Sequence, residues 1–151
     1  MRSAAILLIS VSATLILLIS ATPLAGEEGE YVVPDNVIAL KGKDVIIFTT
    51  SYAKLSPGER VTHFWKALVR AMSHHFKNYD RPIEEGDFSL EERWNGDVWI
   101  KLHDESLIEV SQQDAADHAR DSVMSLANYW LGLVRRYVLE TQPENDPQVV
   151  F

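Results

Sequence analysis

The feature that most limits how this chain can fold is its apolar beginning. Residues 4–21 read AAILLISVSATLILLISA and contain no charged side chain. As a helix they would be about 27 Å long, close to the roughly 30 Å thickness of a bilayer's hydrocarbon core. The stretch is apolar on every side, unlike the one-sided helices that cover a soluble core. We therefore assign residues 1–26 to a membrane anchor or a signal peptide.

Two fates remain open for this segment. The apolar region of a signal peptide usually spans about 7–15 residues, which favours an uncleaved anchor. Cleavage after Ala25 would require a small residue where Pro23 stands, and it would leave a secreted periplasmic protein. Arg2 precedes the segment and acidic residues follow it, so the positive-inside rule places the N-terminus in the cytoplasm. We expect a single-pass protein of the inner membrane with its C-terminal domain in the periplasm or outside the cell.

The net charge of the chain limits the kinds of molecule that it can bind. Its 14 Lys and Arg are outnumbered by 22 Asp and Glu, which gives a net charge of −8. Nucleic acids are held by clusters of Lys and Arg, so we expect no nucleic-acid partner. Cysteine is absent, which excludes disulfides and thiolate metal sites.

The remaining residues divide into three parts. Residues 27–36 form a short acidic spacer, and residues 37–140 hold the amphipathic patterns of one extracytoplasmic domain. Residues 141–151 contain two prolines and are expected to form a flexible tail.

Five short segments have the composition of β-strands. Two apolar runs, residues 37–40 and 44–50, flank a Lys-Gly-Lys turn and predict a β-hairpin. Residues 88–94 alternate apolar with polar side chains and lead into an Asn-Gly pair, the strongest short hairpin signal. Residues 98–102 and 107–110 continue this second segment as a meander.

Two capping boxes predict two helices. The first begins at Ser56, with Pro57 at the first helical position and Glu59 returning to the cap, and it ends before Pro82. Its apolar stripe consists of Val61, Phe64, Trp65, Leu68, Met72 and Phe76.

The second helix is expected to begin at Ser111, with Asp114 closing the box, and to run unbroken to about Glu140. Its stripe consists of Ala115, Ala119, Val123, Leu126, Trp130, Leu133 and Tyr137. The resulting order, ββα followed by βββα, predicts an α+β fold. We expect a two-layer sandwich with a mostly antiparallel sheet and two amphipathic helices, preceded by the apolar N-terminal helix.

No catalytic motif stands out. His74 and His75 are adjacent, so a helix points them about 100° apart, and the other histidines lack metal-ligand spacing. Asp114, Asp117, His118 and Asp121 resemble a carboxylate–histidine cluster, but acidic residues are favoured near a helix start in any case. We predict no catalytic, cofactor-binding or metal-binding residue.

The four tryptophans fall into two groups. Trp65 and Trp130 lie on the helical stripes and are expected in the core. Trp94 and Trp99 flank the Asn-Gly turn, where they either pair across the strands or contact a partner. We take these two as the candidate partner-binding residues.

An ordered set of motifs carries a family resemblance. Val37-Ile38, Gly42 and Ile47-Phe48 come first, followed by a Ser-x-x-Glu-Arg helix start at residues 56–60. A strand leading into Asp114-Ala115 and then Leu126-Ala127-x-x-Trp130 with the pair Arg135-Arg136 completes the set. Together they resemble the soluble periplasmic module that precedes the membrane domain of some bacterial small-conductance mechanosensitive-channel-like proteins. The resemblance implies a freestanding copy of that module, without the channel and without catalytic residues.

Three functions follow as hypotheses. The preferred one is a non-catalytic, membrane-anchored accessory subunit that docks onto other subunits of a larger membrane complex from the periplasmic side. The second is a secreted enzyme or a ligand- or metal-binding domain that uses Asp117 and His118. The third, which rests on the resemblance alone, is a regulator of a mechanosensitive channel.

Overall fold

The computed structural model describes residues 34–41 and 44–142. The apolar segment, most of the acidic spacer and most of the expected tail lie outside this range, and so does the choice between anchor and signal peptide. Within it the elements are strands β1 (Val37–Ala39) and β2 (Val45–Ile47), helix α2 (Pro57–Asn78), the 3-10 turn η1 (Glu85–Asp87), strands β3 (Phe88–Glu92), β4 (Val98–Leu102) and β5 (Glu105–Val110), and helices α3 (Gln112–Asp117) and α4 (Val123–Thr141).

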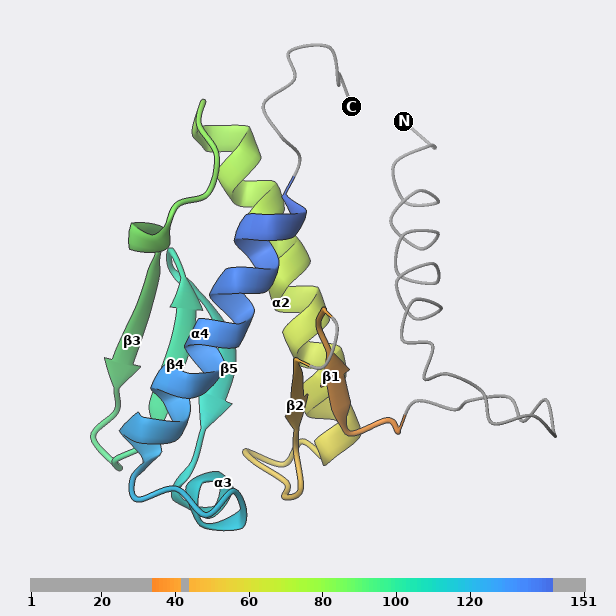
Figure 1. The fold of residues 1–151 in the computed structure, drawn as a ribbon, viewed down its shortest axis with the longest axis vertical. Coiled ribbons are helices and arrows are strands. Elements are labelled where there is room, and N and C mark those ends of the chain that lie inside the picture. The colour runs from red at the N-terminus through yellow and green to blue at the C-terminus, as the bar shows by residue number, and fades with distance from the viewer. Residues whose placement is uncertain (1–33, 42–43, 143–151) are drawn as a thin grey trace, which may run out of the picture.

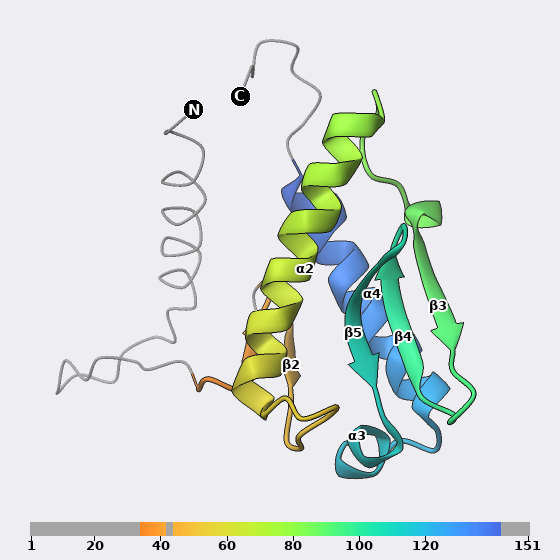
Figure 2. The same ribbon diagram turned by 180° about the vertical axis from the view of Figure 1, so that it is seen from behind.

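Two separate antiparallel sheets and the helices confirm the α+β class. β1 pairs with β2, and β3, β4 and β5 form a sheet in that order, so the two hairpin regions do not join into one sheet. Helix α4 crosses one face of the three-stranded sheet, and α2 runs along its β5 side (Figures 1 and 2). Among the residues described, no helix is long and apolar enough to cross a membrane.

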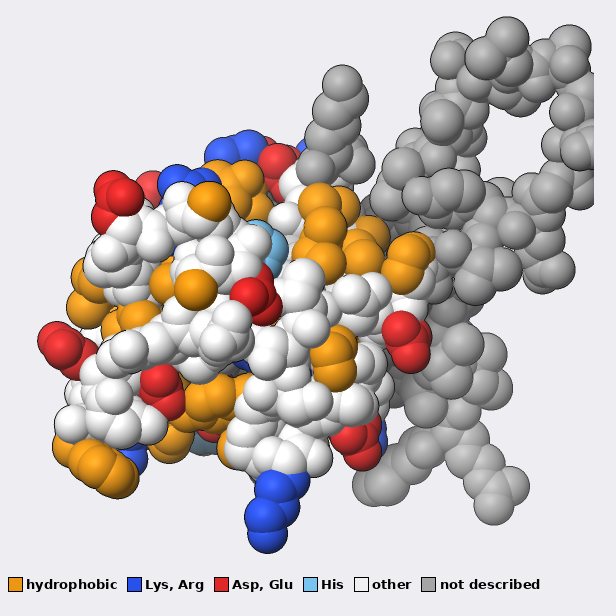
Figure 3. Space-filling model, turned by 90° about the horizontal axis from the view of Figure 1, so that it is seen from below, with side chains coloured by type: hydrophobic (Ala, Val, Ile, Leu, Met, Phe, Trp, Pro, Cys, Tyr) orange, Lys and Arg blue, Asp and Glu red, His pale blue; other side chains and the backbone are white. Residues whose placement is uncertain are grey.

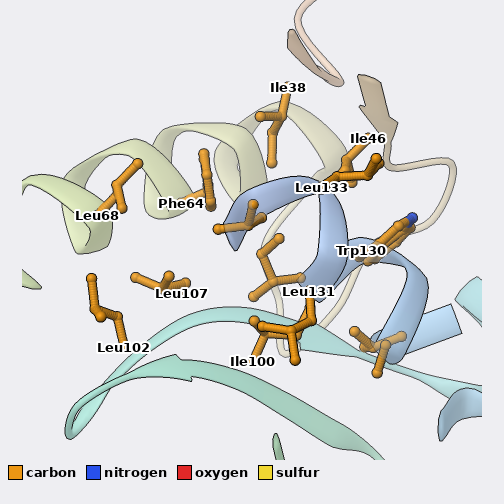
Figure 4. Close-up of a cluster of buried hydrophobic side chains, with 14 of the residues drawn as sticks. Ile38, Ile46, Phe64, Leu68, Ile100, Leu102, Leu107, Trp130, Leu131 and Leu133 are labelled. Atoms are coloured by element: carbon orange, nitrogen blue, oxygen red, sulfur yellow. The ribbon is translucent and has the colours of Figure 1, made fainter. Parts of the chain in front are cut away.

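The core lies between these layers, with α4 at its centre (Figure 4). Val98, Ile100 and Leu102 alternate along β4 and point toward the helices because side chains on a strand face opposite sides in turn. Trp130 is buried, as predicted, and meets Phe48 edge to face at 5.6 Å between ring centroids. The opposite face of the sheet carries polar side chains, such as Ser89, Glu91 and Lys101, together with Trp99.

Helix α2 begins as its sequence predicts. The Ser56 hydroxyl accepts from the Glu59 amide, the Glu59 carboxylate accepts from the Ser56 amide, and Pro57 is the first helical residue. The buried stripe is rotated from the expected one. Phe64 and Leu68 are buried, whereas Phe76 is exposed and His75 takes its place inside.

The expected second helix is wrong as a single element. Ser111 caps α3 with the predicted box, but α3 ends at Asp117 and a new helix starts after Ser122, which caps it through the Ser125 amide. Ala119, expected on the stripe, has φ of +50° in the left-handed region, and this breaks the helical path. The apolar spacing runs through the break, and for that reason periodicity alone conceals it.

Candidate functional site

The carboxylate–histidine cluster suggested by sequence does not assemble. Asp114 is fully buried and accepts two hydrogen bonds from the Arg60 guanidinium, at 2.8 and 2.9 Å. Arg60 also donates to the backbone carbonyls of Thr50 and Glu109, and Asp114 accepts from the amide and hydroxyl of Ser111. Both terminal nitrogens of Arg60 and both carboxylate oxygens of Asp114 thus have partners, as expected of a structural ion pair.

The side chains of the other three members of the suggested cluster, Asp117, His118 and Asp121, form no hydrogen bond with the side chains of the Arg60–Asp114 pair. The Asp117 carboxylate accepts from the Thr49 hydroxyl at 2.5 Å, which lowers its pKa, and His118 Nε2 lies 2.8 Å from the Ile47 carbonyl. These contacts fasten α3 to the first hairpin. Asp121 lies beyond the helix end and is exposed. The three side chains form no common site.

Trp94 stands at the tip of the β3–β4 loop with 94% of its surface exposed. The loop is held rigidly: the Arg93 amide donates to the Asp97 carbonyl at 2.8 Å, and Gly96 takes φ of +84°. Only Gly96, and not Asn95, adopts positive φ, so the turn differs from the two-residue hairpin that the Asn-Gly pair favours. The loop therefore holds the indole of Trp94 out in solvent.

A second contact ties this loop to the rest of the domain. The Asp97 carboxylate accepts from the Tyr52 hydroxyl and from the Asn95 amide, both at 2.7 Å. Burial and the neighbouring Asp97 carboxylate raise the pKa of Tyr52 to about 12, so this hydroxyl keeps its proton and donates at neutral pH.

Trp99 is placed differently from Trp94. It lies on the outer face of the sheet, partly buried, with the Arg93 guanidinium carbon 4.1 Å from its ring centroid. Arg93 and Lys101 both pair with Glu91 on the same face. The two candidate residues thus do not stack on each other, and Trp94 is the one that presents its surface.

The loop between β3 and β4, residues 93–97, is called the Trp94 loop below. An open groove of about 590 Å³ adjoins it. The loop edge at Glu92 and Gly96 forms one side, and the α3–α4 connection with Arg120 and Met124 forms the other. Figure 3 views the molecule from this end and shows hydrophobic side chains in separate groups among polar and acidic ones. An exposed indole beside a groove is the type of surface that a protein partner can bind.

A second candidate site lies at the opposite end of the domain, where α2 ends (Figure 1). His75 from α2, His103 from the β4–β5 turn and Asp87 from η1 bring their ligand atoms within 4.8 Å of one another. His75 Nδ1 lies 2.8 Å from His103 Nε2, closer than van der Waals contact, so the two rings are hydrogen-bonded. The Tyr79 ring lies parallel to both, with centroids about 5 Å away.

The hydrogen-bond partners of the two rings indicate which ring nitrogens carry a hydrogen. His75 Nε2 lies 2.8 Å from the Arg81 carbonyl, which can only accept, so this nitrogen carries a hydrogen. A ring with this single hydrogen accepts at Nδ1, and in that tautomer His103 Nε2 is the donor. His103 Nδ1 then holds a lone pair and faces Asp87 Oδ1 at 3.9 Å.

Beside His103, the negative charge of Asp87 is paired with the positive charge of Arg81. Arg81 donates two hydrogen bonds to Asp87, at 2.6 and 2.7 Å, and the Glu84 amide donates a third. Arg81, with the Glu84 amide, lowers the pKa of Asp87 to about 2. Burial lowers the pKa of His103, against the pull of Asp87, so that its ring is neutral at neutral pH.

Sequence reasoning missed this histidine cluster because its members are 12 to 28 positions apart and come from three elements. The signal available was weak: His75 falls on the apolar side of α2 once the stripe is centred on Phe64 and Leu68. A histidine buried on such a stripe must find hydrogen-bond partners, but the sequence does not say which.

Comparisons with protein-family models, with curated proteins and with solved structures found no match.

Proposed function

We propose that this protein is a non-catalytic accessory subunit that docks onto a larger membrane complex through the Trp94 loop. In this proposal residues 1–26 anchor it in the inner membrane and the α+β domain works on the periplasmic side. The resemblance to periplasmic channel modules, given above on its motifs, supports such a placement.

The observation that carries the proposal is the exposure of Trp94. The ring contributes little to the core, since 94% of its surface faces solvent. Tryptophan is enriched among the residues that dominate binding energy, and rigid presentation reduces the entropy lost on binding. The backbone bonds around Arg93 and Asp97, together with the Tyr52 contact, supply that rigidity.

The groove beside the loop indicates the chemistry of the partner. It combines apolar side chains, such as Val123 and Met124, with two acidic side chains and one basic one, Glu92, Asp121 and Arg120. A protein surface with an apolar pocket for the indole and basic residues around it would complement this end. Anionic lipid is a poor alternative, because the chain carries a net charge of −8.

Site-specific cross-linking in native membranes tests this function. A photoreactive phenylalanine derivative, which keeps an aromatic ring on the loop, replaces Trp94 in one full-length variant and exposed Val69 on α2 in a control. We expect a discrete cross-linked product from position 94 and none of the same mass from position 69. Recovery of the cross-linked partner with Trp94→Ala in mild detergent should fall by at least about 30-fold, as expected of a binding hot spot.

The control for folding is the circular dichroism spectrum of Trp94→Ala, which should match that of the original protein. Wild-type recovery of the partner by a folded Trp94→Ala variant would refute the docking proposal. A partner identified as a channel protein would favour the regulator hypothesis within it.

A further inference from the structure

We infer that His75 and His103 form a binding site for one divalent transition-metal ion of the zinc type, with His75 Nδ1 and His103 Nε2 as protein ligands and Asp87 positioning His103. This inference goes beyond the docking function, because the site lies at the other end of the domain from Trp94.

The first argument is the convergence of two imidazole nitrogens. His75 Nδ1 and His103 Nε2 are 2.8 Å apart, with the ring planes only 16° from parallel. Two nitrogens bound to one tetrahedral zinc at about 2.0–2.1 Å are about 3.3 Å apart. To become a pair of ligands, the two nitrogens would have to move about half an ångström apart, and both rings would have to turn so that each lone pair points at the ion and not at the other ring.

The second argument is what the outer nitrogens face. Histidines that bind metals almost always donate their other N–H to a backbone carbonyl or a carboxylate, which fixes the ring. His75 Nε2 already donates to the Arg81 carbonyl at 2.8 Å, and His103 Nδ1 faces Asp87 Oδ1 at 3.9 Å. The cluster thus has an acceptor behind each of its two rings.

Asp87 is better suited to this supporting position than to direct ligation. Its two oxygens already accept from the Arg81 guanidinium, and one also accepts from the Glu84 amide. A metal would have to compete with that guanidinium for the same lone pairs. The remaining coordination positions are therefore assigned to water or to a small anion.

Proton balance permits the exchange without a change in the charge of the protein. In the neutral pair the hydrogen on His103 Nε2 lies between the rings. When the metal takes this place, the hydrogen moves to His103 Nδ1, which faces the Asp87 carboxylate. His75 keeps its hydrogen on Nε2, so two neutral imidazoles hold the ion, as transition-metal coordination requires.

Access is available on the His103 side. An open hollow of about 300 Å³, lined by His103, His74, Arg70 and Glu105 among others, adjoins the ring. His75 itself is fully buried, and the partly exposed Tyr79 ring covers the pair. Imidazole ligands favour zinc, copper and nickel over the oxygen-seeking magnesium and calcium.

Calorimetric titration of the full-length, metal-free protein in mild detergent with zinc chloride tests the site. We expect one ion per chain and a raised thermal midpoint. His103→Asn should weaken binding by more than about 100-fold, and Asp87→Asn by about 10–100-fold, as expected for an outer partner. Asn is chosen because residue 103 has φ of +52°, a conformation that Asn tolerates.

The matched control is His74→Ala, which removes the exposed neighbour of His75 on the same helix and should leave zinc affinity unchanged. A second measurement needs no variant: nitrogen-15 spectra of the histidine rings should show His75 Nδ1 and His103 Nε2 shifting with zinc. Absence of binding, wild-type affinity in His103→Asn, or shifts confined to other histidines would each overturn the site. None of these results bears on cross-linking at position 94, so the two proposals fail separately.

Discussion

The two ends of the domain treat their buried polar groups in different ways. At the α3 end, Arg60 and Asp114 make two mutual hydrogen bonds, and their further side-chain hydrogen bonds are with backbone carbonyls or with Ser111. At the histidine end, one hydrogen bond joins His75 to His103, and a 3.9 Å gap separates His103 from Asp87.

This difference separates a structural cluster from one that can accept a ligand. The Arg60–Asp114 pair has no free lone pair aimed at open space, so a ligand could bind only by breaking the fold. In the metal site inferred above, the histidine pair opens by a movement of both rings, and an ion takes the place of the shared hydrogen. Buried charge alone is therefore a poor guide to function, and the unused bonding capacity of the cluster is a better one.

The largest expected effect on stability comes from breaking the Arg60–Asp114 ion pair at the α3 end. Asp114→Ala leaves the Arg60 guanidinium buried without its counter-charge, which should lower the free energy of unfolding by about 3–5 kcal/mol. Urea denaturation followed by circular dichroism measures this loss.

The control for this prediction replaces both charges, because a buried ion pair exchanged for apolar residues is often neutral in stability. Arg60→Met with Asp114→Leu should recover part of the loss but not all of it, because the Thr50 and Glu109 carbonyls and the Ser111 amide lose their partners. A change below about 1 kcal/mol in Asp114→Ala would show that the pair is not the structural cluster described above.

A smaller effect is expected at the histidine end in acid. Hydrogen bonds from Arg81 hold the pKa of Asp87 at about 2, against 3.8 for a free carboxyl. A carboxyl with a lowered pKa in the folded state stabilises the protein above its unfolded pKa. That contribution, about 2 kcal/mol, is lost as the pH falls from about 4 toward 2.

The measurement compares metal-free wild type with Asp87→Asn, since other carboxyls titrate in both proteins. The stability difference between them should shrink as the pH falls from 4 to 2. A difference that stays constant over this range would mean that the Arg81–Asp87 pair does not stabilise the fold.

Whether a feature of these two ends could be predicted from the sequence depends on how far apart in the chain its contacting residues lie. Both capping boxes and both hairpins were predictable because their partners lie within a few residues, as with Ser56 and Glu59. The Arg60–Asp114 pair spans 54 positions, so its carboxylate was explained as a cap, which describes only half of its contacts.

The break before α4 was missed for a related reason. A second cap was present in Ser122, but the apolar spacing from Ala115 to Leu126 also fits one helix. In the structure, Asp117 and His118 hold the end of α3 against the first hairpin, and local sequence patterns do not reveal these contacts. The same limit hid the histidine cluster.

The smallest effect is expected at Trp94, and it sharpens the comparison because it separates binding from stability. An indole that is 94% exposed has little surface to lose, so Trp94→Ala should change the free energy of unfolding by no more than about 0.5 kcal/mol. Denaturation of this variant beside wild type measures it. A loss above about 1 kcal/mol would mean that Trp94 supports the loop, and weaker partner recovery could then reflect a distorted loop. With stability unchanged, a large fall in recovery would leave the missing side chain as its cause, since the bonds of Arg93, Gly96 and Asp97 that shape the loop do not involve the indole.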